Sequence, residues 1–302
     1  MKAFGLVAAI ALNMPAAALA QGAGETAQRT RAFDAVNGTT IRCPPPPVRS
    51  PEQQADQFET RPRDLDELSK RAQEFFNSES EFGRAFRERQ ARQFAEDWAF
   101  LCRYRDANAD LVASGVRPVA VFMGDSITEG WFEADPAFFT ANGYVDRGIS
   151  GQSSSQMVVR FAHDVVPLKP DVVHIMAGTN DIGGATGPIT EDEYLANIRA
   201  MLDMAKANGI AVVVAAIPPM SRLLPRPEFD TRPVVPRLNS RLKALAEKDG
   251  ATWVDYFTPL ASSDGSFDPR FANDGVHPTR AGYEVMEPLA RAAVDEALRG
   301  PS

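Results

Sequence analysis

The spacing of hydrophobic positions changes at about residue 118. From there onward, short runs rich in valine and isoleucine alternate with longer stretches in which apolar residues recur every three or four positions. The short runs predict buried strands and the longer stretches predict amphipathic helices. The expected strands are residues 119–123, 144–147, 172–176, 210–217 and 252–255. The expected helices are residues 154–163, 191–208, 235–248 and 281–298.

This alternation predicts a parallel sheet that is covered by helices on both faces. Right-handed crossovers then give a three-layer α/β/α sandwich with a parallel, flavodoxin-like sheet of about five strands. We expect this domain to span residues 118–302.

The region before residue 118 is organised differently. Residues 64–117 place apolar and aromatic side chains among charges, which predicts a helical accessory segment of two amphipathic helices packed on the main domain. The recurring residues are Leu65, Leu68, Ala72, Phe75, Phe76, Phe82, Phe86, Phe94, Trp98 and Leu101. An exposed aromatic stripe for a partner or a membrane surface is the alternative. Residues 21–63 are rich in Pro, Gln, Thr and Arg, and we expect them to be largely irregular.

Residues 1–20 have the layout of a secretory signal peptide. Lys2 precedes an apolar stretch over residues 3–12, and the segment ends in Ala-Leu-Ala. An uncleaved anchor is the alternative, but Asn13 and Pro15 interrupt the run, which is too short to cross ~30 Å of hydrocarbon. We therefore expect an exported protein, periplasmic or extracellular, without stable membrane insertion.

Cys43 and Cys102 are the only cysteines in the chain. In an oxidising compartment they can form a disulfide, which would pin the proline-rich residues 43–47 onto a later helix. Two free, buried thiols are the alternative. Neither state suggests thiol catalysis, because no histidine lies nearby to activate a thiolate.

The net charge of the chain limits the kinds of molecule that it is expected to bind. A formal net charge of -8 over 302 residues lacks the basic surface that phosphate backbones require, so we expect no nucleic-acid partner. No feature of the sequence predicts an oligomeric state.

Four polar motifs fall where a parallel sheet binds its ligands, beyond the carboxyl ends of its strands. Gly-Asp-Ser-Ile-Thr at residues 124–128 follows the first strand, Gly-Ile-Ser-Gly at 148–151 the second, and Gly-Thr-Asn-Asp at 178–181 the third. Asp-Gly-Val-His at 274–277 lies in a late loop. We call these segments the four motif loops and expect them to converge on one edge of the sheet.

A serine hydroxyl attacks an ester only when a base takes its proton and a third group orients that base. Ser126 is the candidate nucleophile. Of the three histidines, His163 lies in a helical pattern and His174 in a strand, so we expect both to be structural. His277 lies in a polar loop at the ligand edge. Asp274 precedes it by three residues and can orient its ring, although a helix cap is the alternative.

Acyl transfer also needs hydrogen-bond donors for the tetrahedral oxyanion. The candidates are the backbone N–H groups of Ser126 and Gly151 and the side-chain amide of Asn180. Gly151 as a turn residue and Asn180 as a turn or cap residue are the structural alternatives.

Other residues beside these motifs are candidates for substrate contact. They are Asp125, Thr179 and Trp131, with core packing as the alternative for Trp131. Residues 218–236 interrupt the regular alternation after the fourth strand. This segment either borders the acyl or alcohol site or covers the edge of the sheet.

Taken in order, the four motif loops resemble the sequence blocks of the SGNH hydrolases, also called the GDSL family. The resemblance covers residues 119–298 and implies the three-layer fold, an esterase without metal or organic cofactor, and a triad of Ser126, His277 and Asp274. It also implies that Gly151 and Asn180 help to form the oxyanion hole.

The chain departs from the pattern in having Asp146 and Arg147 where many relatives carry an Asn. It also lacks the Gly-x-Ser-x-Gly elbow of the α/β-hydrolases. The first departure leaves open which hydrogen bonds support the second motif loop, and the second disfavours the α/β-hydrolase fold.

The expected function is hydrolysis of carboxylic esters, with small acyl (acetyl) esters, including those on carbohydrates, as the leading substrates. Lysophospholipase or lipase-type activity on longer acyl chains is the alternative. A non-catalytic carbohydrate-binding module on the same fold would not need a serine paired with a base. A metal-dependent hydrolase using Asp274, His277 and Asp181 lacks a second histidine at the loop.

Overall fold

The computed structural model describes residues 32–38, 40–43, 50–59, 64–78, 80–223, 226 and 228–300. The predicted signal peptide and residues 44–49 lie outside the described residues.

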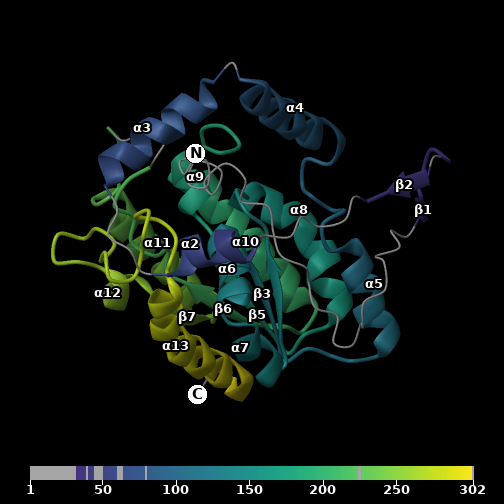
Figure 1. The fold of residues 1–302 in the computed structure, drawn as a ribbon. Helices are drawn as coiled ribbons and strands as arrows, with labels where there is room; N and C mark the ends of the chain where they lie inside the picture. Colours follow the sequence, from purple (N-terminus) through teal and green to yellow (C-terminus); the bar gives the residue numbers. More distant parts are fainter. Residues whose placement is uncertain are drawn as a thin grey trace.

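A five-stranded parallel sheet forms the centre of the main domain (Figure 1). The strands are β3 (Ala120–Gly124), β4 (Tyr144–Gly148), β5 (Val172–Met176), β6 (Ala211–Ala215) and β7 (Thr252–Val254). Their spatial order is β4-β3-β5-β6-β7, and every neighbouring pair is parallel. This is the flavodoxin-like order, so the predicted three-layer fold is confirmed.

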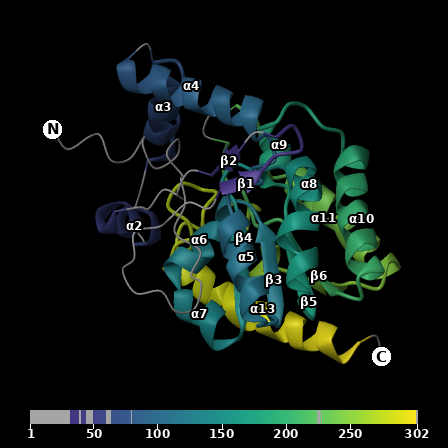
Figure 2. The ribbon, with the colours of Figure 1, turned by 90° about the vertical axis from the view of Figure 1, so that its right-hand side faces the viewer.

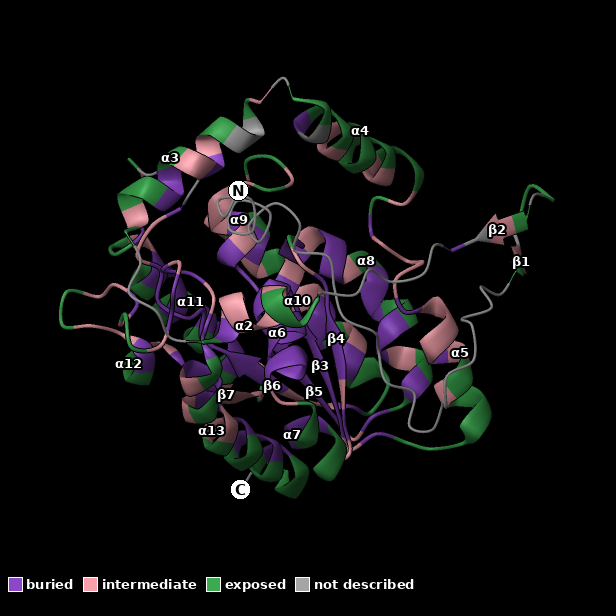
Figure 3. Ribbon diagram, viewed as in Figure 1, coloured by how far each residue is buried: buried purple, intermediate pink, exposed green. Residues whose placement is uncertain are grey.

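Helices cover both faces of the sheet, and the alternation of side chains along each strand explains the two layers. On one face, Phe122 of β3 packs in a cluster with residues of α6 (Ser126–Ala134), α7 (Pro136–Ala141) and α13 (Arg280–Arg299). On the other face, Val121 packs with residues of α8 (Ser154–Asp164), α10 (Glu191–Ala207) and α11 (Val234–Lys248). Both layers are clusters of buried apolar side chains, and Figure 3 shows buried ribbon at the centre of the molecule.

Side-chain caps fix where several of these helices begin. Thr190 and Ser153 each form a capping box, with Glu193 and Gln156 respectively, at the start of α10 and α8. Asp125 caps α6 by accepting the backbone N–H of Ile127 at 2.9 Å. Such caps satisfy backbone donors that the first helical turn leaves unpaired. The remaining short elements are the 3-10 turn η1 (Val166–Leu168), α9 (Thr179–Gly183) and α12 (Phe257–Leu260).

The region predicted to be irregular contains regular elements. Its described residues form an antiparallel hairpin of β1 (Ala32–Asp34) and β2 (Thr40–Arg42), followed by α2 (Pro51–Phe58). Sequence periodicity missed them because the strands are three residues long, and because α2 begins on the local signal of a capping box between Ser50 and Gln53.

Residues 64–117 form three helices rather than two: α3 (Leu65–Phe76), α4 (Glu81–Glu96) and α5 (Arg105–Ser114). Figures 1 and 2 show α3 and α4 at the end of the molecule opposite α13. The third helix, α5, which the sequence pattern did not predict, contacts α8 and η1 of the main domain. Most of α4 is exposed (Figure 3), because its sequence is dominated by charged residues.

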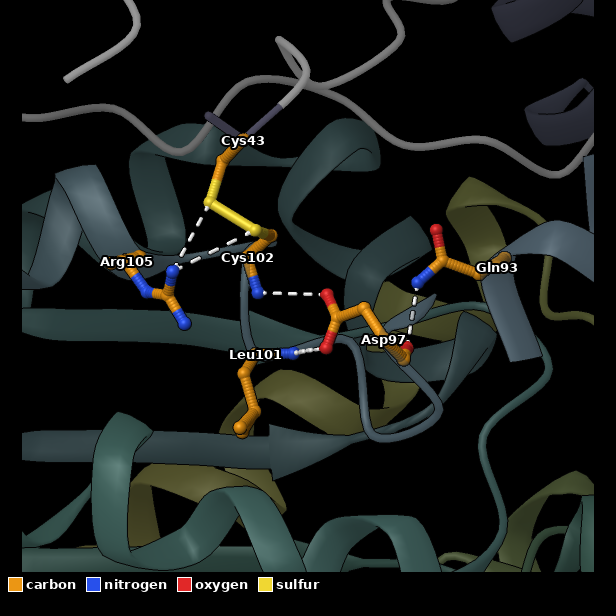
Figure 4. The surroundings of a disulfide bond; sticks show 6 residues. All are labelled: Cys43, Gln93, Asp97, Leu101, Cys102 and Arg105. Carbon is orange, nitrogen blue, oxygen red and sulfur yellow. Dashed lines mark hydrogen bonds between the residues drawn. A yellow bond between two sulfur atoms is a disulfide. The ribbon is translucent and has the colours of Figure 1, made fainter. Parts of the chain in front are cut away.

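A disulfide joins Cys43 to Cys102 (Figure 4). Cys102 lies in the turn before α5, not on a helix as the sequence suggested. The bond therefore fixes the segment after the β1-β2 hairpin to a stretch without regular secondary structure. Within the described ranges, none of the helices combines the length and the apolar character that crossing a membrane requires.

Candidate active site

Ser126 lies at a sharp junction between strand and helix. It is the first residue of α6, two positions after the end of β3. The helix approaches the sheet so closely that a Cβ atom on Gly148 would lie 2.2 Å from the backbone nitrogen of Glu129. Glycine at this position lets α6 start directly above the sheet edge, which aims the Ser126 side chain across that edge.

A chain of hydrogen bonds links Ser126, His277 and Asp274. The Ser126 Oγ lies 2.9 Å from His277 Nε2, and His277 Nδ1 lies 2.7 Å from Asp274 Oδ2. The other Asp274 oxygen accepts the backbone N–H groups of Val276 at 2.9 Å and His277 at 2.8 Å. With Nδ1–H donated to the carboxylate, Nε2 is left to accept the serine proton. The three-residue spacing thus folds the aspartate back onto the ring.

The segment predicted to interrupt the alternation, residues 218–236, supports the histidine loop in its described part. Ser221 donates its N–H to the carbonyl of Gly275 at 2.8 Å. Gly275 has φ +79°, and a Cβ there would lie 2.8 Å from Ser221 Cβ. Met220 is buried and its carbonyl accepts the hydroxyl of Thr231 at 2.6 Å. The sequence left two alternatives for this segment, namely bordering the acyl or alcohol site and covering the edge of the sheet. These contacts match neither fully, because they show the segment supporting the loop that carries His277.

Electrostatics keep Asp274 ionised. Burial raises the pKa of its carboxyl, but the charge of His277 and the hydrogen bonds from His277 and Val276 outweigh burial and lower the pKa to about 2. A carboxylate that stays charged across the neutral range can hold the imidazole in one orientation and stabilise its protonated form.

The three candidate oxyanion donors lie at the carboxyl ends of neighbouring strands. Gly151 follows β4, and a Cβ there would meet nothing within 4 Å, so a substrate has room to approach. Asn180 lies on α9, just after β5. Its Nδ2 is 3.2 Å from Asp125 Oδ2 and 3.0 Å from the carbonyl oxygen of Gln152. These two acceptors hold the Asn180 amide in place. To donate to an oxyanion as well, one of its two N–H groups must form a bifurcated hydrogen bond.

Asp125 and Trp131 do not fit the sequence-based expectation of substrate contact. Asp125 is 1 % exposed, and its carboxylate caps α6 and accepts Asn180. Burial raises its pKa to about 6, against the opposing effects of the Ile127 N–H and the His277 charge. Trp131 is completely buried and stacks on Phe138 with ring centroids 5.2 Å apart. Both expectations are therefore wrong: one residue is a cap and the other belongs to the core. Thr179 is buried at the first position of α9.

The other two histidines lie away from Ser126. His174 is completely buried on β5, where its Nε2 is 3.0 Å from the hydroxyl of Tyr256 and its ring stacks on Phe122. Burial lowers its pKa to about 3, so it stays neutral in the core. His163 is exposed near the end of α8.

Sequence reasoning missed Arg160, which is completely buried beside the site. It donates to the carbonyl of Gly124 at 2.9 Å and to Asp164 at 3.1 Å, and it also hydrogen-bonds Gln152. A signal was present, since Arg160 falls at helical spacing on the same face of α8 as the buried Met157 and Asp164. A charged residue on such a face needs a partner in the core.

Residues required by the metal alternative are used elsewhere. Asp181 accepts the N–H of Ser154 at 3.0 Å and also its hydroxyl hydrogen. Across the ranges that the structure describes, no group of three or more His, Cys, Asp and Glu side chains is placed to hold a metal ion.

Comparisons with known proteins identify the family of the chain. Residues 122–285 match the GDSL-like lipase/acylhydrolase family. A solved structure of a protein assigned as an acylhydrolase, from Bacteroides fragilis NCTC 9343, is 43% identical with a TM-score of 0.64, and the match covers 68% of this chain and 100% of that one. A GDSL-like lipase from Bacteroides thetaiotaomicron VPI-5482 is 39% identical with a TM-score of 0.63, over 67% of this chain and 100% of that one.

A comparison with the curated proteins finds no match. The family match covers more than half of the 302 residues, and two solved structures match over their whole length at well above 30% identity. The chain therefore belongs to the GDSL-like lipase/acylhydrolase family of carboxylic ester hydrolases.

Proposed function

We propose that the protein is an exported serine esterase that hydrolyses small acyl esters, acetyl esters on carbohydrates among them, through an acyl-enzyme on Ser126. The observation that carries this proposal is the hydrogen-bonded chain from Ser126 Oγ to His277 Nε2 at 2.9 Å and from His277 Nδ1 to Asp274 at 2.7 Å. A serine, a base and an orienting carboxylate in this order are what acyl transfer needs.

In the first half of the reaction, His277 Nε2 takes the proton of Ser126 while the serine oxygen bonds to the ester carbonyl carbon. The carbonyl oxygen becomes an oxyanion, for which the N–H groups of Ser126 and Gly151 and the amide of Asn180 are the donors. His277 then gives its proton to the alcohol oxygen as the carbon–oxygen bond breaks, which leaves the acyl group on Ser126.

In the second half, a water molecule loses a proton to His277 and attacks the acyl carbon. The bond to Ser126 breaks, the serine recovers its proton from His277, and the carboxylic acid leaves. Asp274 stays ionised throughout and holds the ring, as its lowered pKa requires.

Two features support a small acyl group. Ser126 is only 6 % exposed, which leaves little room around its hydroxyl. The large apolar side chains that the motif loops carry, Ile127, Ile149 and Val276, are all buried. A long acyl chain binds by removing apolar surface from water, and these loops offer little of it. The lipase-type alternative is therefore less well supported.

Export is supported by two independent features. Residues 1–20 carry the sequence pattern of a secretory signal. The Cys43–Cys102 disulfide is a bond that oxidising compartments favour and the cytosol does not.

Hydrolysis of p-nitrophenyl acetate by the mature protein and by Ser126→Ala tests the reaction. We expect turnover by the wild type and a loss of at least ~10³-fold in kcat/KM for the variant, with an unchanged melting temperature. Ser114→Ala, which alters an exposed serine near the end of α5, is the control and should keep wild-type activity. Equal rates for wild type and Ser126→Ala would contradict the proposal.

A series of p-nitrophenyl esters from acetate to octanoate, together with acetylated xylose, tests the substrate class. The proposal expects kcat/KM to fall as the acyl chain grows, and it expects release of acetate from the sugar. A kcat/KM that rises steadily toward octanoate would instead support the lipase-type alternative.

A further inference from the structure

Residues 97–104, which we call the brace, form a tight turn between α4 and α5 (Figure 4). The carboxylate of Asp97 accepts the backbone N–H groups of Leu101 at 2.7 Å and Cys102 at 3.0 Å. Phe100 within the turn has φ +58°, an unusual value for a residue with a side chain. Such backbone persists only where its surroundings hold it in place. Here the Asp97 carboxylate and the disulfide at Cys102 do so.

The brace contacts the loop that carries Gly151 through the backbone carbonyl of Ala99. Gln152, the residue after Gly151, donates its side-chain amide to the carbonyl of Ala99 at 3.0 Å. The Gln152 carbonyl in turn accepts the side-chain amide of Asn180 at 3.0 Å. One residue therefore links the brace to two of the candidate oxyanion donors.

Tyr104 reaches the other end of the same loop. Its side chain is 1 % exposed, its hydroxyl donates to the carbonyl of Gly148, and it lies 3.2 Å from Asp146 Oδ2. Asp146 Oδ1 accepts the N–H of Gly148 at 2.9 Å. The guanidinium groups of Arg103 and Arg147 both lie over the Tyr104 ring, each 4.7 Å from its centroid. These contacts hold the ring while its hydroxyl holds the end of β4.

Arg103 acts on the centre of the loop through Glu129. Arg103 Nη2 lies 3.1 Å from Glu129 Oε1, and the other Glu129 oxygen accepts the N–H of Ser150 at 3.0 Å and also its hydroxyl hydrogen. Glu129 is 1 % exposed. A buried carboxylate is costly unless it is paired, so Arg103 makes it possible for Glu129 to hold Ser150, the residue before Gly151.

We propose that the brace is a positioning device for the oxyanion loop, residues 148–152, with Tyr104 and Arg103 as its positioning residues. This inference rests on the proposed function, because the position of the loop affects the reaction only if the N–H of Gly151 donates to the oxyanion. The brace contacts the loop directly at Gly148 and Gln152, on both sides of Gly151, and it reaches Ser150 through Glu129, which pairs with Arg103. A donor preorganised in this way stabilises the tetrahedral intermediate more than the bound ester, so its displacement lowers kcat rather than substrate affinity.

Tyr104→Phe tests the proposal because it removes the hydroxyl and keeps the ring that contacts the two guanidinium groups. We expect kcat for p-nitrophenyl acetate to fall about 10- to 100-fold while KM changes less than about threefold. Affinity for a phenylboronic acid, which forms a tetrahedral adduct with the serine, should fall by a similar factor. The control is Tyr256→Phe, which removes another buried hydroxyl that bonds His174, a residue of the core. This control should keep both values within about twofold.

Arg103→Met and Arg103→Lys form a second pair, which decides the question if Tyr104→Phe does not fold. The methionine removes the charge that pairs with Glu129, while the lysine retains it. We expect the methionine variant to lose kcat and boronic acid affinity together, and the lysine variant to recover most of both.

The proposal is overturned if Tyr104→Phe keeps wild-type kcat and boronic acid affinity, or if Tyr256→Phe shows equal losses, because a general effect of a buried cavity would then explain both. Failure of the proposed function gives a different result, namely activity that survives in Ser126→Ala.

Discussion

The main domain and the N-terminal region are stabilised by different kinds of interaction. The sheet of the main domain is buried between two apolar layers that are built from all five strands. The N-terminal region reaches residues beside the motif loops through polar contacts, such as the hydrogen bond from Asn273 to the carbonyl of Gln57 at 3.2 Å and the ion pair between Asp66 and Arg222. Phe58 of α2 adds an apolar contact to the core of the main domain. The apolar layers place the reacting side chains, and the polar contacts fix the loops around them.

This difference separates the residues that carry out the proposed reaction from those that hold the surrounding loops in position. Every residue of the proposed reaction belongs to the main domain, and the residues that hold the 148–152 loop from outside belong to the turn before α5. Changes in the first group should affect chemistry most, whereas changes in the second should affect stability and loop position.

The largest expected effect is in the main domain. Asp274→Asn removes the charge that orients His277, and we expect kcat to fall about 10³- to 10⁴-fold. Asp268→Asn is the matched control, since Asp268 lies in the same late region and pairs only with the exposed Arg270. Steady-state kinetics above pH 7 measure both. If Asp274→Asn keeps more than a tenth of wild-type kcat, the orienting role of Asp274 is wrong.

The disulfide should contribute the next largest effect, and it acts on stability. The bond closes a loop with a sequence separation of 59. Replacing Cys43 and Cys102 by serine should lower the free energy of unfolding by about 4 kcal/mol in the chain-entropy account. Urea denaturation measures this, with and without dithiothreitol. The reductant should destabilise the wild type alone; equal midpoints for wild type and double variant would show that the bond does not stabilise the fold.

Asp146 should make stability depend on pH. Burial raises its pKa to about 7, against the opposing hydrogen bond from Gly148. The folded protein therefore keeps a proton that the unfolded chain loses near pH 4, and the stability contributed by this group is full below pH 4 and is lost as pH rises toward 7.

Asp146→Asn removes this titration. At pH 8 the variant should be more stable than the wild type by roughly 2 to 4 kcal/mol, and the difference should shrink toward pH 4. Thermal unfolding at a series of pH values measures it. Parallel pH profiles for the two proteins would mean that Asp146 ionises in the folded state as freely as in water.

The smallest effect is expected where α3 meets residues 218–236, the segment that supports the loop carrying His277. Asp66 is 84% exposed and Arg222 is 29% exposed, so water screens their ion pair. Asp66→Ala should change the free energy of unfolding by less than about 1 kcal/mol and leave kcat within twofold. A larger loss of activity would show that α3 acts on the histidine loop, and the division of work between the two regions would need revision.

The sheet could be predicted from the sequence because buried parallel strands read as continuous apolar runs. All five expected strands are present near their predicted bounds. Helix α7 and the hairpin were missed because each is short. The third helix of the accessory segment was missed because apolar residues continue at helical spacing through residues 97–104. The pattern therefore reads as one continuous helix there, whereas α4 ends before Asp97.

The site could be predicted only in part. The spacing of Asp274 and His277 is local, and the approach of Ser126 follows from the topology of the sheet. The roles of Tyr104, Arg103 and Glu129 depend on which side chains become buried beside β4, and no local pattern encodes that. The predicted substrate contact of Trp131 was wrong for the same reason: every residue of its helix, α6, is buried, and no local pattern shows this.

Covalent trapping of Ser126 tests the central claim most directly. After treatment with diethyl p-nitrophenyl phosphate, intact mass and peptide mapping should show one diethyl phosphoryl group per chain, on the peptide that contains Ser126. Labelling should become far slower in a folded His277→Ala variant. A label on any other residue, or an active esterase that takes no label, would contradict the assignment of Ser126 as the nucleophile.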